Sequence, residues 1–177
     1  MKGFKTNKSY LILSLLGITL LLFPPIYGCK TEDHRIIQTS SLTPINEPQF
    51  TKEGELIFFS KNNKEIITID IEIPETREEK SRGLMYRHVM AETEGMVFVN
   101  EMSKQHFFWM ENTYIPLDMI FVDKKMQIVK IEKNTIPLSE MLIAVPKDAQ
   151  YTIEVNAGFC DRHSIKIGDS LQMVKIP

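Results

Sequence analysis

Six residues have side chains of the types that line pockets for small polar ligands. Trp109 offers an aromatic face, and Asn112 and Asn156 both donate and accept hydrogen bonds. Asp118 is able to pair with a guanidinium. Ligand pockets combine apolar walls with a few polar groups, and an aromatic face suits the apolar side of a sugar ring. These types predict a ligand-binding cleft formed by Arg82, Trp109, Asn112, Asp118, Asn156 and Arg162.

The same residues also have a purely structural interpretation. Asp118 lies inside the apolar run 116–122, and a buried carboxylate needs hydrogen bonds or a positive partner. An internal ion pair with Arg82 or Arg162 would meet that need. Trp109 would then be a core residue, and the two asparagines would form turns by bonding nearby backbone. Both interpretations stay open on the sequence alone.

Catalytic and metal-binding motifs are absent from the sequence. The four histidines do not stand at ligand spacing, and there is no HExxH, CxxC, GxSxG or phosphate-binding glycine pattern. We therefore expect no catalytic residue, no metal and no cofactor. A hydrolase stays open as an alternative, because Ser139, Ser164 or Cys160 could still meet a histidine in space. Cys160 itself is predicted to be a small buried hydrophobic residue.

The first 28 residues have the pattern of a secretory signal peptide. Three lysines precede an apolar run, 10–23, that is shorter than the roughly 20 residues of a membrane-spanning helix. The sequence Ile26-Tyr27-Gly28-Cys29 resembles the lipobox of bacterial lipoproteins, whose cysteine is acylated after cleavage. An uncleaved anchor helix and an ordinary secreted protein are the alternatives. The prolines at 24 and 25, which end a helix, favour the lipoprotein.

We therefore expect a cell-envelope lipoprotein that is processed by the lipoprotein signal peptidase and sorting machinery. Its domain lies outside the cytoplasm and is anchored to the membrane through fatty acid, such as palmitate, on Cys29. The second residue of the mature chain is Lys30 and not aspartate, which favours the outer membrane. Residues 29–50 are predicted to form a flexible tether, and 51–177 a single β-rich domain.

Charge argues against a nucleic-acid partner. The signal peptide removes three of the 21 basic residues and no acid, so that 18 basic residues face 23 acidic ones in the mature chain. The mature chain then has a net charge of about −5, whereas nucleic acid attracts clustered Lys and Arg.

Short strands separated by turns account for most of the domain. Isoleucines at 67, 69, 71 and 73 alternate with polar residues, and the turn at Asn62 and Asn63 joins this strand to the preceding one as a hairpin. Thr76 and Glu79 form a capping-box pattern before a short polar helix. Roughly eight strands and one or two short helices indicate an antiparallel sandwich or barrel. The aromatic run 107–110 is predicted to be one of the buried strands.

Several motifs resemble the prokaryotic family catalogued as domain of unknown function 192. They are RGLMYR at 82–87, GMVFV at 95–99, the run 108–123, EVNAG at 154–158 and DRHSIKIGD at 161–169. The resemblance covers about 69–176 and implies a mostly β, jelly-roll-like domain with no assigned activity. Met126 and Ser164 stand near places where the family has glycine, which predicts turns of another type or length there.

These observations favour a non-catalytic module that binds a small polar ligand, with carbohydrate as the leading candidate. A protein-interaction or structural domain of the envelope is the first alternative, and an uncharacterised hydrolase is the second. An interaction domain would show an exposed apolar patch. A binding module would hold Trp109 and Asp118 together in one pocket.

Lipidation at Cys29 is testable by metabolic labelling. Labelled palmitate should mark the wild type and not Cys29→Ala, because the thiol is the acylated group. Equal uptake of label by the two proteins would contradict the predicted anchor.

Overall fold

The computed structural model describes residues 47–101 and 105–176. The predicted signal peptide, Cys29 and the tether up to residue 46 lie outside the described residues. Within the described ranges, no helix is long and apolar enough to cross a membrane. The last part of the predicted tether, 47–50, is described, and there Glu47 Oε1 accepts a hydrogen bond from the backbone of His88 at 2.6 Å.

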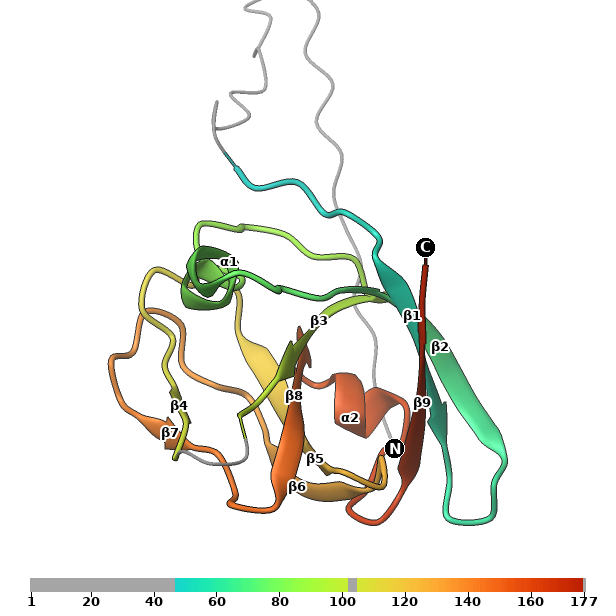
Figure 1. Ribbon diagram of the computed structural model, residues 1–177. Helices are drawn as coiled ribbons and strands as arrows, with labels where there is room; N and C mark the ends of the chain where they lie inside the picture. Colours follow the sequence, from blue (N-terminus) through green and yellow to red (C-terminus); the bar gives the residue numbers. More distant parts are fainter. Residues whose placement is uncertain (1–46, 102–104, 177) are drawn as a thin grey trace, which may run out of the picture. The chain divides into compact units, whose positions relative to one another are not determined.

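Nine strands and two short helices make up the described part of the chain (Figure 1). Seven strands form one sheet in the order β6-β5-β8-β3-β2-β1-β9, and β4 and β7 form a separate pair. The elements are β1 (Gly54–Phe59), β2 (Glu65–Glu72), α1 (Arg77–Arg82), β3 (Glu94–Val99), β4 (Phe107–Phe108), β5 (Leu117–Asp123), β6 (Ile128–Glu132), β7 (Ile143–Ala144), β8 (Ala149–Asn156), α2 (Phe159–Arg162) and β9 (Ser170–Lys175).

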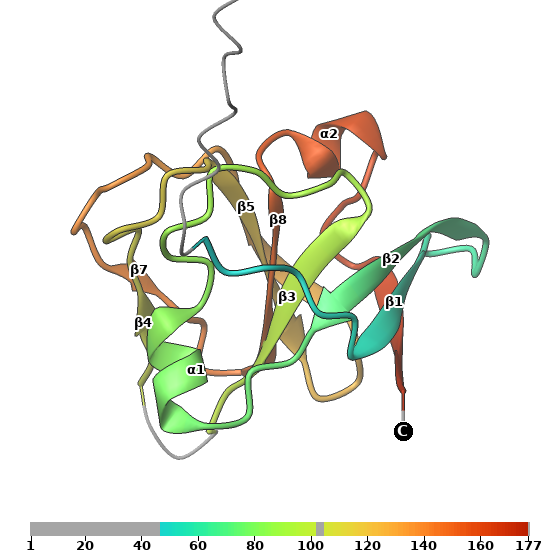
Figure 2. The same ribbon diagram turned by 90° about the horizontal axis from the view of Figure 1, so that it is seen from above.

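The prediction of a mainly β fold is confirmed, and the large sheet is mixed. Its neighbouring strands are antiparallel except for β2 and β3, which run parallel and are joined through α1. The two outer strands meet at their starts, where Gln127 and Ser170 form an isolated bridge. Leu171 N also donates to Met126 O at 2.8 Å. The sheet therefore curls toward a barrel (Figures 1 and 2).

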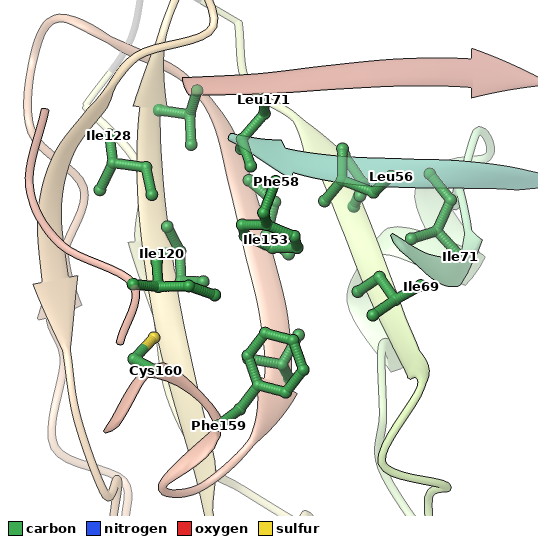
Figure 3. Close-up of a cluster of buried hydrophobic side chains, with 14 of the residues drawn as sticks. Leu56, Phe58, Ile69, Ile71, Ile120, Ile128, Ile153, Phe159, Cys160 and Leu171 are labelled. Atoms are coloured by element: carbon green, nitrogen blue, oxygen red, sulfur yellow. The ribbon is translucent and has the colours of Figure 1, made fainter. Parts of the chain in front are cut away.

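The inner face of the curled sheet encloses the larger apolar core (Figure 3). Strand residues such as Phe58, Ile120 and Ile153 are fully buried there, and α2 adds Phe159 and Cys160. Burying a side chain of this size contributes about 1.5–3 kcal/mol. The prediction that Cys160 is a buried hydrophobic residue is confirmed, and burial, together with the nearby Asp118, raises the pKa of its thiol far above the usual range.

The outer face of the central strands carries a second apolar core. Met96, Phe98, Met119 and Phe121 are buried on this face. Figures 1 and 2 show α1 and the β4–β7 pair on this side, and α2 on the other. Strands covered on both faces read as continuous apolar runs, which explains the sequences of β3 and β5.

Helix α1 begins and ends as its sequence predicts. Thr76 and Glu79 form a capping box, in which each side chain accepts a hydrogen bond from the other residue's backbone. Gly83 ends the helix with φ 48° and ψ −129°, a conformation that residues with a Cβ rarely adopt. A Cβ at Gly83 would also lie 3.2 Å from the Phe98 ring. Glycine thus lets the chain turn so that Leu84 packs into the outer core.

The turns at Met126 and Ser164 have positive φ without glycine. Met126 has φ 62° and Ser164 has φ 56°, so both residues adopt the left-handed conformation that glycine normally supplies. The side chain of Met126 packs against the inner core, which offsets part of the backbone strain. The difference in turn type or length from the family stays a prediction.

The aromatic run is not a buried strand. Only Phe107 and Phe108 are paired, as β4, and Phe107 is 53% exposed. Trp109 is 46% exposed and so is not a core residue. The run lies over the outer core instead of within the sheet, and of its residues only Met110 is fully buried.

The buried ion pair of the domain joins Glu72 at the end of β2 to Arg87. Arg87 Nη2 donates to Glu72 Oε1 at 2.9 Å, and Arg87 Nη1 lies 2.6 Å from Glu72 Oε2. Both residues are buried, and Thr51 N also donates to Glu72 Oε1. The pair fixes the segment that follows α1 against the end of β2.

Breaking this pair should be costly, and removing both partners should not. Arg87→Met should lower the free energy of unfolding by about 3–5 kcal/mol, because it leaves the buried Glu72 carboxylate without its positively charged partner. Adding Glu72→Met should restore most of the loss, which denaturant titrations would measure. Arg162→Met, at an exposed pair with Glu92, serves as control and should have a much smaller effect. A double variant no more stable than Arg87→Met would contradict this account.

Candidate functional site

A pocket of about 310 Å³ opens on the outer face of the sheet, between α1, the end of β3 and the aromatic run. Its apolar wall includes Leu84, Phe98 and Phe108. The rings of Phe98 and Phe108 meet edge to face, with centroids 5.0 Å apart. Lys80 and Arg82 line it from the last turn of α1. The pocket thus combines an apolar wall with a few polar groups, as small-molecule sites do.

Trp109 and Phe107 give the pocket an exposed aromatic border. Both line the pocket while about half of each side chain stays accessible to solvent. An aromatic face that is accessible and beside a cavity is able to stack on a ligand. The exposure of Trp109 therefore agrees with the predicted aromatic platform better than with the predicted core residue.

Glu154 of β8 is the most unusual group in the pocket. It is 5% exposed and lies opposite Met96 of β3 and Met119 of β5. Within 47–101 and 105–176 its side chain has no hydrogen bond and no ion pair, although buried polar groups normally have one. Burial raises the pKa of its carboxyl to about 8. A neutral carboxyl both donates and accepts, and this one borders an open cavity.

The protein itself satisfies the polar groups of Asn100 and His106 beside the pocket. Asn100 Nδ2 donates to Thr152 Oγ1 at 3.0 Å, and Asn100 N donates to Gln150 O at 2.8 Å. His106 lies 2.7 Å from the backbone oxygen of Glu101 through Nε2. The contrast leaves Glu154 as the group whose hydrogen-bonding capacity is directed at the pocket and not used by the fold.

Asp118 is not part of this pocket, and the predicted pairing with an arginine is wrong. Asp118 is fully buried, and its two oxygens accept from Asn134 N and Cys160 N, each at 3.0 Å. Successive residues of a strand face opposite sides of a sheet. Asp118 therefore faces the inner core, whereas Met119 shares the outer face with Glu154. Backbone N–H groups, not a guanidinium, satisfy this carboxylate.

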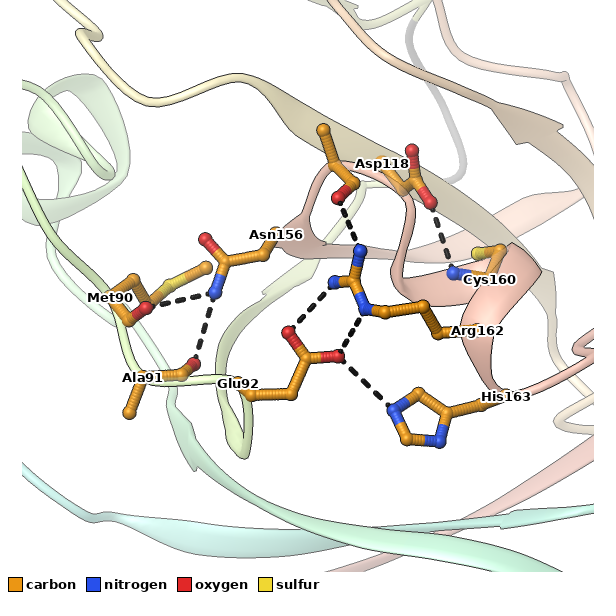
Figure 4. A network of polar contacts seen from close by, with 9 residues as sticks. Met90, Ala91, Glu92, Asp118, Asn156, Cys160, Arg162 and His163 are labelled. Atoms are coloured by element: carbon orange, nitrogen blue, oxygen red, sulfur yellow. Dashed lines mark hydrogen bonds and ion pairs between the residues drawn. The ribbon is translucent and has the colours of Figure 1, made fainter.

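Asn156 and Arg162 hold a loop (Figure 4) and are not among the residues that line the pocket. Asn156 Nδ2 donates to the backbone oxygens of Met90 and Ala91, at 2.9 and 3.1 Å. Arg162 donates to both oxygens of Glu92, at 2.8 and 2.7 Å. Together these contacts tie the loop before β3 to the end of β8 and to α2.

Asn112 has a structural position next to the pocket. Its φ of 54° places it in a tight turn, and its backbone oxygen accepts from Tyr86 N at 2.8 Å. Its amide nitrogen lies 4.0 Å from the sulfur of Met85, which lines the pocket. Of the six predicted site residues, the structure therefore brings Arg82 and Trp109 into one pocket, with Asn112 behind it.

Sequence analysis missed Glu154, although the EVNAG motif contains it. The alternation of β8 marks its polar residues as the face away from the core. The signal for the burial of Glu154 lies in the partner strands. Strands β3 and β5 are apolar on both faces, so β8, which lies between them, must also be covered on both faces.

No group of three His, Cys, Asp or Glu side chains within 47–101 and 105–176 is arranged to hold a metal ion. The segment 136–142, which precedes β7, exposes several large apolar side chains: Ile136, Leu138, Met141 and Leu142. Such residues are typical of a surface that contacts another molecule.

Comparison with known proteins gives a family and two similar structures. The model of the family DUF192, described as uncharacterized ACR, matches residues 58–173. A structure from Sinorhizobium meliloti 1021, provisionally described as a transcription regulator, is 29% identical, covers 71% of this chain and 98% of its own, and has a TM-score of 0.65. A protein of unknown function from Novosphingobium aromaticivorans is 30% identical, with 67% and 83% coverage and a TM-score of 0.61. None of the curated proteins matches the chain.

The environment of Glu154 predicts a pH-dependent stability. Because its pKa is raised from 4.5 to about 8 on folding, the folded state binds this proton more tightly than the unfolded state. The stability that the protonated Glu154 contributes below about pH 4.5 should be lost progressively as the pH rises through about 8. The loss is about 1.4 kcal/mol per pH unit and at most about 5 kcal/mol over the window.

Denaturant titrations across this range would measure the effect. Glu154→Gln, which cannot ionise, should lack this component, so its stability relative to wild type should rise with pH. Exposed Glu140→Gln is the control and should follow the wild type. Parallel pH profiles for wild type and Glu154→Gln would contradict the assignment.

Proposed function

The chain belongs to the DUF192 family, and we propose that its domain is a non-catalytic module that binds one small polar ligand. The ligand lies in the pocket between α1 and the aromatic run, and a sugar is the leading candidate. The family's description leaves the activity open, so the proposal is argued from the pocket itself.

The observation that carries the proposal is the unpartnered carboxyl of Glu154. Glu154 is buried opposite Met96 and Met119, and it borders the open cavity. A ligand hydroxyl that accepts from the neutral carboxyl and donates back to it would supply hydrogen bonds that the described residues do not supply.

The size and border of the pocket support a ligand of monosaccharide size. A volume of about 310 Å³ is at the small end of the range for ligand pockets. Trp109 supplies an accessible ring for the apolar face of a sugar, and Arg82 supplies hydrogen-bond donors at the rim. A pyranose has an apolar face that suits Trp109 and hydroxyl groups that suit Glu154 and Arg82.

We also propose that the protein is a lipoprotein of the cell envelope, anchored through Cys29, with the domain in the periplasm and the outer membrane as the favoured location. The lipobox-like sequence ending at Cys29 and Lys30 after it support this. A module held near the membrane by a tether would meet its ligand in the envelope space. The lipid, not the domain surface, provides the anchoring.

DNA is not the favoured partner, although one similar structure is provisionally described as a transcription regulator. This chain has 23 acidic and 21 basic residues before any cleavage. The negative balance argues against a phosphate-binding surface, which requires clustered Lys and Arg.

Ligand binding is testable by NMR. Adding glucose, N-acetylglucosamine or glucuronate at millimolar concentration should shift amide signals of residues around Glu154 and Trp109. Trp109→Ala should weaken binding about tenfold, because a lost stacking contact is worth about 1.4 kcal/mol.

The control for this experiment is Tyr114→Ala. Tyr114 is similarly exposed, but it stacks on His88 and does not line the pocket, so its removal should leave sugar binding unchanged. If no sugar shifts the pocket signals, or if Trp109→Ala binds like wild type, the proposal fails. That result would favour a protein-interaction domain, which the exposed apolar segment 136–142 supports. Release of cleaved sugar from an oligosaccharide would instead favour a hydrolase.

A further inference from the structure

Two cations at the rim of the pocket lack a carboxylate partner. The side chains of Lys80 and Arg82 form no hydrogen bond or ion pair with any residue in the two described ranges. The nearby Glu79 carboxylate is already engaged at the start of α1, where it accepts from Thr76 N and Glu75 N. The N–H groups of Thr76 and Glu75 and, to a lesser extent, the charge of Arg82 lower the pKa of the Glu79 carboxyl. The rim therefore presents positive charge that the protein neutralises only in part.

Five titratable side chains face the pocket. They are Lys80 and Arg82 from α1, Glu101 and His106 from the segment between β3 and β4, and Glu154 from β8. With its pKa raised by burial to about 8, Glu154 is mostly neutral at pH 7. Lys80 and Arg82 then outnumber the charged Glu101, so the local balance favours an anion.

The charged and neutral groups also differ in depth. Lys80 and Arg82 are exposed at the rim, whereas Glu154 is buried at the floor. A ligand that uses both must carry its negative charge at one end and a neutral hydrogen-bonding group at the other. A guanidinium binds a carboxylate through two parallel hydrogen bonds, so carboxylate is the anion that suits Arg82.

On the basis of the function proposed above, we infer that the pocket selects an acidic monosaccharide, a hexuronate. Its carboxylate pairs with Arg82, its ring lies on Trp109, and one of its hydroxyl groups bonds the carboxyl of Glu154. Lys80 adds positive charge at the rim but no fixed geometry. A neutral hexose would fill the same volume without neutralising the rim.

Three sugars of nearly the same shape test this inference. D-glucuronate carries a carboxylate, D-glucose carries no charge, and D-glucosamine carries an ammonium group. Trp109 is the only tryptophan of the chain, so its fluorescence in the full-length protein reports binding in the pocket. At about pH 6.5, glucuronate should bind at least tenfold more tightly than glucose, and glucosamine should bind most weakly. Added salt should reduce the preference.

Variants distinguish the effect of the Arg82 charge from the effect of the rest of the pocket. Arg82→Gln should bring glucuronate binding close to the level of glucose, because it removes the charge. It should change glucose binding much less, because glutamine keeps hydrogen-bond donors at the rim. Arg77→Gln removes a charge from the same helix at a position that does not line the pocket, and should keep the preference. Glucuronate affinity should fall as the pH rises through about 8 in the wild type, and should not do so in Glu154→Gln.

The outcomes are distinguishable. Binding of glucose and glucuronate with equal affinity, or a preference for glucosamine, would overturn the inference while the proposed sugar-binding module stands. A preference for glucuronate that persists in Arg82→Gln would overturn the assigned contact. If a folded protein binds none of the three sugars, both the inference and the proposed function fail.

Discussion

The pairing of β3, β8 and β5 at the centre of the sheet is the constraint on which the rest of the domain depends. Both faces of these strands are covered, one by the inner core with α2 and the other by the aromatic run and the segment after α1. Two apolar layers from one set of strands let a chain of this length bury many large side chains. The same arrangement buries Glu154 of β8 between two apolar strands, beside the open pocket.

Two carboxyl groups in these strands show how position decides role. Asp118 faces the inner core, and its two oxygens accept from backbone N–H groups of the segment after β6 and of α2. Glu154 faces the outer layer, and no described group satisfies it. The first stabilises the fold by holding these two segments, and the second costs stability. Uncompensated cost of this kind concentrates at functional sites.

Local sequence signals predict the elements well and the contacts between them poorly. The hairpin at Asn62 and the capping box at Thr76 depend on residues within a few positions, and both are confirmed. The partner of Asp118 and the burial of Glu154 depend on which strands are neighbours. In the chain, β8 follows β7, yet it pairs with β3 and β5. Non-local pairing of this kind leaves no periodic pattern, so the predicted site joined residues that lie on opposite faces of the sheet.

The meeting of β6 and β9 has a consequence for behaviour at high concentration. Outer strands of an open sheet expose unpaired backbone groups that recruit other chains and lead to aggregation. Here the starts of the two outer strands are hydrogen-bonded to each other. Their free lengths carry Lys130 and Lys175, which pair with Glu132 and Glu75, and charged side chains on an edge strand disfavour the addition of another strand. Protected edges of this kind oppose strand-to-strand association when the domain is concentrated.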